Sequence, residues 1–307
     1  MTDLSVEISG LTLKNPIMLA SGILGETGSS LMRVARAGAG AVVTKSIGPE
    51  PREGYPNPTV VELEAGIINA VGLANPGIDA YLEEMEVARH GGVPVIGSVF
   101  GKNEGEMSEV ARLMEEAGAS AIELNLSCPH ARNVGAELGR DPETVGSVVS
   151  VVKNCVRVPV FAKISPNVTD VVDAGLAVAN SRGDGIVAIN TVKAMAISPE
   201  TGRPVLSNKI GGLSGPAIKP IGVRCVYELY ENVDVPIIGV GGILTGKDAL
   251  EYLMAGATAV QIGSAAYYRG IEVFGRVVNE IERFLDEYGY GSVKDVVGMA
   301  HDVDEDR

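Results

Sequence analysis

The sequence predicts an α/β fold, a single closed (β/α)8 barrel of the TIM type. Short apolar runs rich in Val and Ile recur along the chain, and stretches with helical spacing lie between them. Near-continuous apolar runs of this length are typical of parallel strands that are buried on both faces. Strands alternating with helices form either a closed barrel or an open, doubly wound sheet. The open sheet is disfavoured because no Gly-x-Gly-x-x-Gly turn follows the first strand.

Eight segments are the expected barrel strands. In chain order they are Pro16–Ala20, Ala41–Lys45, Pro94–Val99, Ala121–Leu126, Pro159–Ile164, Gly185–Asn190, Pro236–Val240 and Ala259–Gly263. Helical spacing is clear in Glu104–Ala117, where Val110, Leu113 and Met114 share one face. The other expected helices are Pro142–Val156, Thr169–Asn180, Ala217–Leu229, Gly246–Met254 and Ile271–Tyr288. Several helices run into the next strand through a Gly that can end the helix in the left-handed conformation.

Two segments lie outside this repeat. Leu4–Lys14 alternates around Ser9-Gly10 and predicts a β-hairpin at the bottom of the barrel. Thr191–Leu213 has no clear helical period and predicts a protrusion inserted after the sixth strand. The remaining chain is close to the roughly 250 residues typical of such barrels. We therefore expect one domain over residues 1–307, with the insertion at about 191–213.

Composition excludes several classes of protein. The formal net charge of −14 disfavours binding to nucleic acid or to an anionic membrane, because both need basic patches. No export signal or membrane-spanning run is evident, so a cytoplasmic protein is expected. Cys128, Cys155 and Cys225 are too few and too scattered for a disulfide framework or a zinc site.

The chemistry of such a barrel takes place at the carboxyl ends of its strands. Every expected strand ends there in polar residues or glycine: Ser21-Gly22, Lys45-Ser46, Ser98, Asn125 to Cys128, Lys163, Asn190-Thr191, Gly241-Gly242 and Gly263-Ser264. A lysine at a strand end is often only a solvated charge. Two such lysines at one rim favour a site, because buried ammonium groups require partners.

The last two strands end in Gly241-Gly242 and Gly263-Ser264, each followed by a helical stretch. Backbone N–H groups at such turns bind anions, and the loops after strands seven and eight commonly hold phosphate. Glycine pairs also serve as plain turns, but their place on these two strands favours a phosphorylated cofactor or substrate.

Cys128 lies in Asn125-Leu126-Ser127-Cys128-Pro129-His130 at the end of the fourth strand. An inert buried thiol is the usual fate of Cys and suits Cys155 and Cys225. The polar surroundings of Cys128 favour a chemical role, and its chemistry alone leaves nucleophile and general base open. Cys128 and His130 are too few ligands for a metal, so no metal site is expected.

At these residues the sequence resembles dihydroorotate dehydrogenases, specifically the catalytic subunit of the class 1B type. The resemblance extends over nearly the whole chain. Its specific segments are Thr44-Lys45-Ser46, Asn69 to Gly77 (NAVGLANPG), Asn125 to Pro129, Asn190-Thr191, Met195 to Ile197, and Gly211 to Pro220 (GGLSGPAIKP). Two positions depart from the family pattern: Ser98 and His130 stand where Asn is frequent, and no family role is carried over to them.

The resemblance implies a barrel that holds FMN over its carboxyl rim and oxidises (S)-dihydroorotate to orotate in pyrimidine biosynthesis. The implied FMN contacts are Ser21, Lys45, Ser46, Asn125, Lys163, Ile189, Gly215, Gly241, Gly242, Gly263 and Ser264. The implied substrate contacts are Lys45, Asn69, Ala70, Val71, Gly72, Leu73, Asn125, Asn190 and Thr191. Cys128 as thiolate would remove the C5 proton while hydride passes from C6 to the flavin, and Lys163 would stabilise negative charge on the reduced ring.

The resemblance also implies partners. Family members with a membrane anchor use Ser as the base, whereas this chain has Cys and no evident anchor. The class 1B type passes electrons to NAD through a separate subunit carrying FAD and a 2Fe-2S cluster, around a homodimeric core of a heterotetramer. Three scattered Cys cannot ligate a cluster in this chain. A fumarate-linked homodimer is the alternative within the family.

Two other classes of function stay open on the residues alone. Lys163 in a barrel with a phosphate site could form a Schiff base, as in an aldolase, and only the flavoprotein would be yellow. A non-catalytic scaffold would leave the polar strand ends and the two lysines unexplained.

Overall fold

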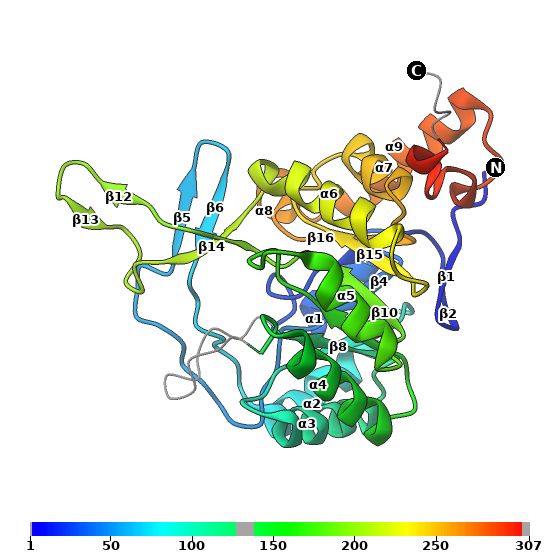
Figure 1. The fold of residues 1–307 in the computed structure, drawn as a ribbon. Coiled ribbons are helices and arrows are strands. Elements are labelled where there is room, and N and C mark those ends of the chain that lie inside the picture. The colour runs from blue at the N-terminus through cyan, green and yellow to red at the C-terminus, as the bar shows by residue number, and fades with distance from the viewer. Residues whose placement is uncertain (1, 127–137, 303–307) are drawn as a thin grey trace.

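A closed barrel of parallel strands forms the centre of the molecule (Figure 1). The computed structural model describes residues 2–126 and 138–302. Within them eight strands close the barrel in the order β10-β15-β16-β3-β4-β7-β8-β9. Their bounds are β3 Ile17–Leu19, β4 Ala41–Val43, β7 Val95–Val99, β8 Ala121–Asn125, β9 Val160–Lys163, β10 Gly185–Ala188, β15 Ile237–Val240 and β16 Ala259–Ile262. Each strand lies within a predicted segment, and most of its residues are buried, so the predicted barrel is confirmed.

Helices surround the strands. The predicted helices are present as α3 Glu104–Glu116, α4 Pro142–Cys155, α5 Val171–Asn180, α6 Lys219–Tyr230, α7 Gly246–Met254 and α9 Val273–Tyr288. Ala217 and Ile218, expected to open α6, belong instead to a 3-10 helix over Pro216–Ile218. Three further helices were not predicted: α1 Gly28–Arg36, α2 Ile78–Arg89 and α8 Ala265–Arg269. None of the described helices is long and apolar enough to cross a membrane.

The N-terminal hairpin is also confirmed. Strands β1 (Val6–Ile8) and β2 (Leu11–Leu13) pair in antiparallel register around Ser9 and Gly10, both at positive φ. The inward side chains of Ile8 and Leu13 are fully buried. The Ser9 hydroxyl donates to the carbonyl oxygen of Asp184, the residue before β10. The hairpin therefore covers the amino end of the barrel, opposite the expected site.

The protrusion is built from two distant segments of the chain. A four-stranded sheet, β11-β14-β6-β5, contains β11 (Val192–Ala194) and β14 (Gly211–Ser214) from the predicted insertion. Its other strands, β5 (Val60–Leu63) and β6 (Gly66–Asn69), come from the chain between β4 and α2 and were not predicted. Strands β12 (Ile197–Ser198) and β13 (Arg203–Pro204) form a hairpin at its tip. Figure 1 shows this arm projecting away from the barrel.

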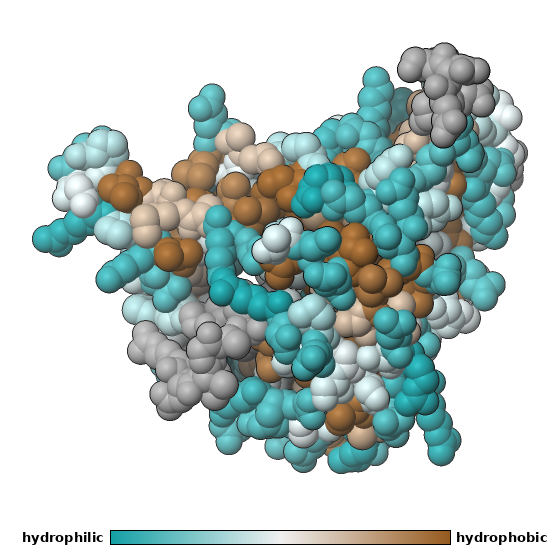
Figure 2. Space-filling view, viewed as in Figure 1, coloured by the Kyte–Doolittle hydropathy of each residue, from teal (hydrophilic) through white to brown (hydrophobic). Residues whose placement is uncertain are grey.

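The arm exposes apolar side chains. Val60, Met195, Ile197 and Ile210 are each 45–57% exposed. Figure 2 shows hydrophobic surface along the arm, interrupted by polar residues. An exposed apolar patch of this kind is typical of a surface that contacts another protein.

Candidate active site at the carboxyl end of the barrel

A chain of polar side chains crosses the rim from β7 to β10. The hydroxyl oxygens of Ser46 and Ser98 lie 2.9 Å apart. The side-chain amide of Asn125 donates to the Ser46 hydroxyl at 3.0 Å, and the Asn190 amide lies 3.4 Å from the Asn125 amide oxygen. The structure thus brings three predicted site residues together. Ser98, which carried no predicted role, is fully buried and supports Ser46 from the neighbouring strand.

A second polar group fills the interior of the barrel around Lys163. Its ammonium nitrogen lies 3.2 Å from Gln261 Oε1, 3.4 Å from Ser21 Oγ and 3.5 Å from Glu123 Oε1. Lys163 is buried, and Glu123 and Gln261 are fully buried. Glu123 and Gln261 were not predicted from the sequence. The available signal was a single polar residue in the middle of an apolar strand, in AIELN and AVQI.

Lys45 has a separate partner. Its ammonium group forms an ion pair with Glu26 at 3.2 Å. The Lys45 side chain is only 9% exposed, whereas that of Glu26 is 75% exposed. A partner in contact with water is screened and contributes little. The two predicted lysines therefore reach the same end of the barrel with different anionic partners, one open to solvent and one inside the barrel.

The predicted anion-binding turns have the backbone that glycine requires. Gly215, Gly241 and Gly242 all have φ between +70° and +130°. A Cβ on Gly242 would lie 2.8 Å from Gly215 O and 2.9 Å from Lys219 N. Gly242 and Gly215 are therefore in close approach, although 27 residues separate them in the sequence. Gly263 and Ser264 follow β16 directly and lead into α8. At the end of β10, the Ile189 N–H donates to Val240 O at 3.0 Å, next to these turns.

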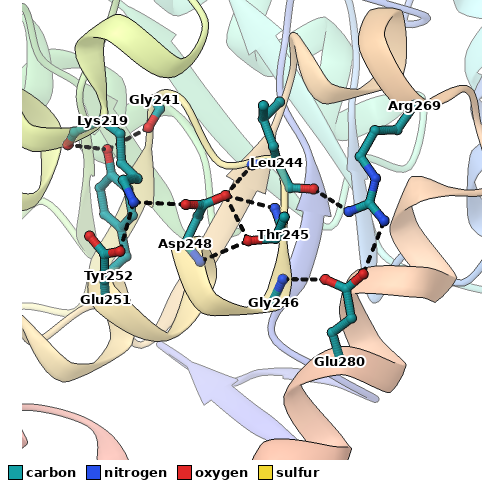
Figure 3. Close-up of polar contacts among 10 residues, drawn as sticks. All are labelled: Lys219, Gly241, Leu244, Thr245, Gly246, Asp248, Glu251, Tyr252, Arg269 and Glu280. Atoms are coloured by element: carbon teal, nitrogen blue, oxygen red, sulfur yellow. Dashed lines mark hydrogen bonds and ion pairs between the residues drawn. The ribbon is translucent and has the colours of Figure 1, made fainter.

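Ion pairs and helix caps hold the turn between β15 and α7 in place (Figure 3). Asp248 lies between Lys219, 2.7 Å away, and the backbone N–H groups of Leu244 and Thr245, at 3.0 and 2.8 Å. Burial raises the pKa of Asp248, but these hydrogen bonds outweigh burial and leave the pKa below its ordinary value. Burial likewise lowers the pKa of Lys219, while its bonds to Asp248 and Glu251 raise it above its ordinary value. Asp248 is therefore a carboxylate and Lys219 an ammonium at neutral pH.

Three more side chains hold the same turn. Glu280 on α9 accepts from Gly246 N at 2.6 Å and pairs with Arg269 at 3.0 Å. Arg269 also donates to Leu244 O at 2.5 Å. On the inner side, the Tyr252 hydroxyl donates to Gly241 O at 2.7 Å. Burial raises the pKa of Tyr252, so its phenol stays a neutral donor. The turn is fixed before any ligand arrives, which is what an anion site made of backbone N–H groups needs.

Residues 69–73, predicted to contact substrate, are held at the rim mainly by the buried side chain of Asn75. Asn69 ends β6, and its amide donates to Gly212 O at 3.3 Å. Residues 70–77 then loop back, with Gly72 and Leu73 at positive φ. Asn75 accepts from Gly77 N and Gly48 N, at 2.9 and 3.2 Å, and donates to Leu73 O at 2.9 Å. Asn75 therefore fixes the loop that contains Ala70, Val71, Gly72 and Leu73 against the chain after β4.

Asn167 likewise holds a backbone segment, the one that follows β10, and it was not predicted. Its amide donates to Thr191 O at 3.0 Å, and its side-chain oxygen accepts from Lys193 N at 2.8 Å. The side chain of Asn190 accepts from Thr191 N at 2.8 Å. Thr191 is therefore held at the base of the arm, beside the polar chain of the rim.

This arrangement combines a closed barrel, glycine-rich turns after its last two strands and a rim of amide side chains. A sequence model described as dihydroorotate dehydrogenase matches residues 3–285. The chain belongs to the dihydroorotate dehydrogenase family.

Relatives of similar length agree. The chain is 54% identical over 303 residues to a protein of Methanocaldococcus jannaschii named dihydroorotate dehydrogenase B (NAD(+)), catalytic subunit, with 97% of this chain and 98% of that one covered. A Pyrococcus furiosus protein of the same name is 51% identical over 300 residues, with 98% and 99% covered. The fold matches a dihydroorotate dehydrogenase of Eimeria tenella, solved in complex with ferulenol, with a TM-score of 0.83 and 27% identity. That match covers 98% of this chain and 89% of the other.

Cys128 was predicted to be the base of this dihydroorotate dehydrogenase family member. It lies outside the described residues, as does His130. Cys225 matches the expectation of an inert thiol, because it is fully buried and burial raises its pKa to about 11. The expectation of a buried thiol was wrong for Cys155, which lies exposed because it is the last residue of α4, on its outer surface.

Proposed function

We propose that this chain oxidises (S)-dihydroorotate to orotate in pyrimidine biosynthesis, as the FMN-containing catalytic subunit of an NAD-linked dihydroorotate dehydrogenase. The observation that carries the proposal is the carboxyl rim. There, amide and hydroxyl side chains from four strands lie beside a buried lysine, in a chain of the family that these relatives represent.

The residues present suit FMN. We assign its phosphate to the turns at Gly241, Gly242, Gly263 and Ser264, which follow the last two barrel strands, because backbone N–H groups at such turns commonly bind phosphate. The other proposed FMN contacts lie around the rim and barrel interior: Ser21, Lys45, Ser46, Asn125, Lys163, Ile189 and Gly215. When bound, FMN supplies the acceptor for a hydride. Lys163 contributes a positive charge, which favours the negative charge of a reduced flavin.

The rim residues orient the substrate. Dihydroorotate presents alternating N–H and C=O groups on a ring, and side-chain amides match both kinds of group. Asn69, Asn125 and Asn190 supply such amides, and Asn75 and Asn167 hold the backbone of two of these segments in place. Lys45 at the same rim supplies a cation for the substrate carboxylate.

We assign the removal of the C5 proton to Cys128. It follows β8 by three positions, after Asn125 at the rim and the fully buried Leu126. The thiolate is the active form of such a base.

A second subunit completes the reaction. The relatives' names include both NAD(+) and "catalytic subunit", which favours an NAD-linked assembly over the fumarate-linked alternative. We propose a cytoplasmic heterotetramer in which two copies of this chain form the core and the partner carries FAD and a 2Fe-2S cluster. The apolar side chains of the arm offer surface for such contacts.

The test uses the purified full-length chain loaded with FMN. We expect a yellow protein without FAD or iron, whose flavin bleaches when dihydroorotate is added without oxygen. NAD reduction should stay negligible until the partner subunit is added. A colourless protein that dihydroorotate leaves unchanged would favour the Schiff-base aldolase, and rapid NAD reduction by this chain alone would contradict the assignment of the partner.

A further inference from the structure

Glu123 is an unusual residue for the place it occupies. It is the third residue of β8, and its side chain is fully buried inside the barrel. A carboxylate in such a place is costly unless it is paired and hydrogen-bonded. Its nearest cation is Lys163, the lysine that we place against the flavin.

The ion pair between these residues is long. Glu123 Oε1 lies 3.5 Å from Lys163 Nζ. Charge-assisted N–H···O bonds are usually about 2.7–2.9 Å. The other carboxylate oxygen instead accepts a short bond, 2.6 Å, from Gln261 Nε2. The Glu123 carboxylate is thus held mainly by the Gln261 amide and lies farther from the Lys163 ammonium group than a direct ion pair would place it.

Gln261 connects the two charges. Its amide nitrogen donates to Glu123, and its amide oxygen accepts from Lys163 at 3.2 Å. Gln261 can donate to Glu123 and accept from Lys163 in only one orientation of its amide group. It therefore fixes the distance between the carboxylate and the ammonium group. The three side chains come from β8, β9 and β16, and the backbone of a closed barrel gives them little freedom to move apart.

We propose that Glu123 and Gln261 are positioning residues that set how much positive charge Lys163 presents to the flavin. This rests on the proposed function. The buried carboxylate offsets part of the lysine charge and so holds the flavin midpoint potential below the value that an unpaired Lys163 would give. Gln261 keeps the carboxylate far enough from the lysine that the offset is incomplete.

Two near-isosteric substitutions test this with opposite signs. Glu123→Gln removes the negative charge and keeps the size of the side chain, so the midpoint potential of bound FMN should rise. Gln261→Met removes the amide that holds the carboxylate away from the lysine, so Glu123 can approach Lys163 and the potential should fall. We expect each shift to change the ratio of reduced to oxidised flavin at a fixed potential at least tenfold, which is about 30 mV for a two-electron couple.

Controls separate charge from structure. Glu109→Gln makes the same chemical change on an exposed face of α3 and should leave the potential unchanged. Lys163→Met should lower the potential, because it removes the cation itself. A redox titration with dye standards reads all four variants without relying on turnover, and the FMN dissociation constant is measured in parallel.

The outcomes are distinct. If Glu123→Gln leaves the potential unchanged or lowers it, Glu123 serves only to hold Lys163 in place and the proposal is wrong. Should that variant fail to fold, Gln261→Met decides alone, and an unchanged or raised potential overturns the proposal. If neither variant retains FMN while the parent does, the two residues are needed for structure alone, which also overturns it. A parent chain that binds no FMN would instead refute the proposed function.

Discussion

Replacing Gly242 with alanine should damage both the stability of the barrel and its affinity for FMN. Gly242 has φ +70°, and the left-handed conformation costs a non-glycine residue about 1–2 kcal/mol. The new Cβ would also lie 2.8 Å from Gly215 O and 2.9 Å from Lys219 N, which are backbone atoms that cannot rotate away. Overpacking of this kind typically costs about 1–3 kcal/mol. Together the loss in free energy of unfolding should be about 2–5 kcal/mol.

Gly10→Ala is the matched control. Gly10 also has positive φ, +85°, but its Cβ would have no described atom within 4 Å. Only the conformational cost of about 1–2 kcal/mol then applies. Gly10 lies in the hairpin at the amino end of the barrel, so FMN affinity should not change.

Denaturant unfolding of the FMN-free variants measures the loss of stability, and titration with FMN measures the loss of FMN affinity. Gly242→Ala should unfold at a lower denaturant midpoint than Gly10→Ala. It should also bind FMN more weakly, because Gly215 has to move and is itself a proposed contact. The reasoning fails if Gly242→Ala is no less stable than Gly10→Ala, or if it binds FMN with the parental affinity.

The remaining predictions concern Cys128 and Asp248. Cys128→Ser should slow flavin reduction about 100- to 10,000-fold near pH 7 while FMN stays bound, and Cys225→Ser should affect only stability. Stopped-flow bleaching by dihydroorotate tests this, and a parental rate in Cys128→Ser would remove Cys128 as the base. Asp248→Asn loses the charge that holds Lys219 and two backbone N–H groups, and should cost about 1–3 kcal/mol at neutral pH. Because the folded pKa of Asp248 is lowered, its contribution is present above the unfolded pKa of about 3.9 and disappears as pH falls through the folded pKa. The parent and Asp248→Asn should therefore converge in stability in acid, and a gap that stays constant from neutral pH to below the folded pKa would contradict this.

The barrel could be predicted because its strands are buried on both faces and so carry an unbroken apolar signal. The arm gives no such signal. In β5, Val60, Glu62 and Leu63 are exposed, so the run is neither continuous nor clearly alternating. Helix α2 begins at Ile78 after Gly77, which has no side chain to cap it, and α8 has only five residues. These elements depend on contacts with distant parts of the chain, which no local pattern records.

The residues of the candidate site likewise fall into those that could be predicted from the sequence and those that could not. Residues at strand ends, such as Lys163 and Asn190, could be found because a polar residue at a known rim is conspicuous. Glu123 and Gln261 were missed because they lie within strands, where only the closed barrel shows that β8 and β16 face each other across the interior. Asn167 binds the backbone of Thr191 and Lys193, and Asn75 binds that of Gly48 besides its close neighbours Leu73 and Gly77, so their function depends on the fold rather than on a motif.

The arm also imposes an order on folding. Strand β6 pairs with β14, and Asn69 reaches Gly212 across 143 residues. During synthesis, the β5–β6 hairpin must therefore wait for most of the barrel before its partner strand exists, and an isolated two-stranded hairpin is marginally stable in water. Contacts this distant form late, because the chain must first close a very long loop. The substrate contacts proposed beside the arm are thus among the last parts of the molecule to assemble, and a nascent chain cannot form both halves of the arm until residue 214 of 307 has been made.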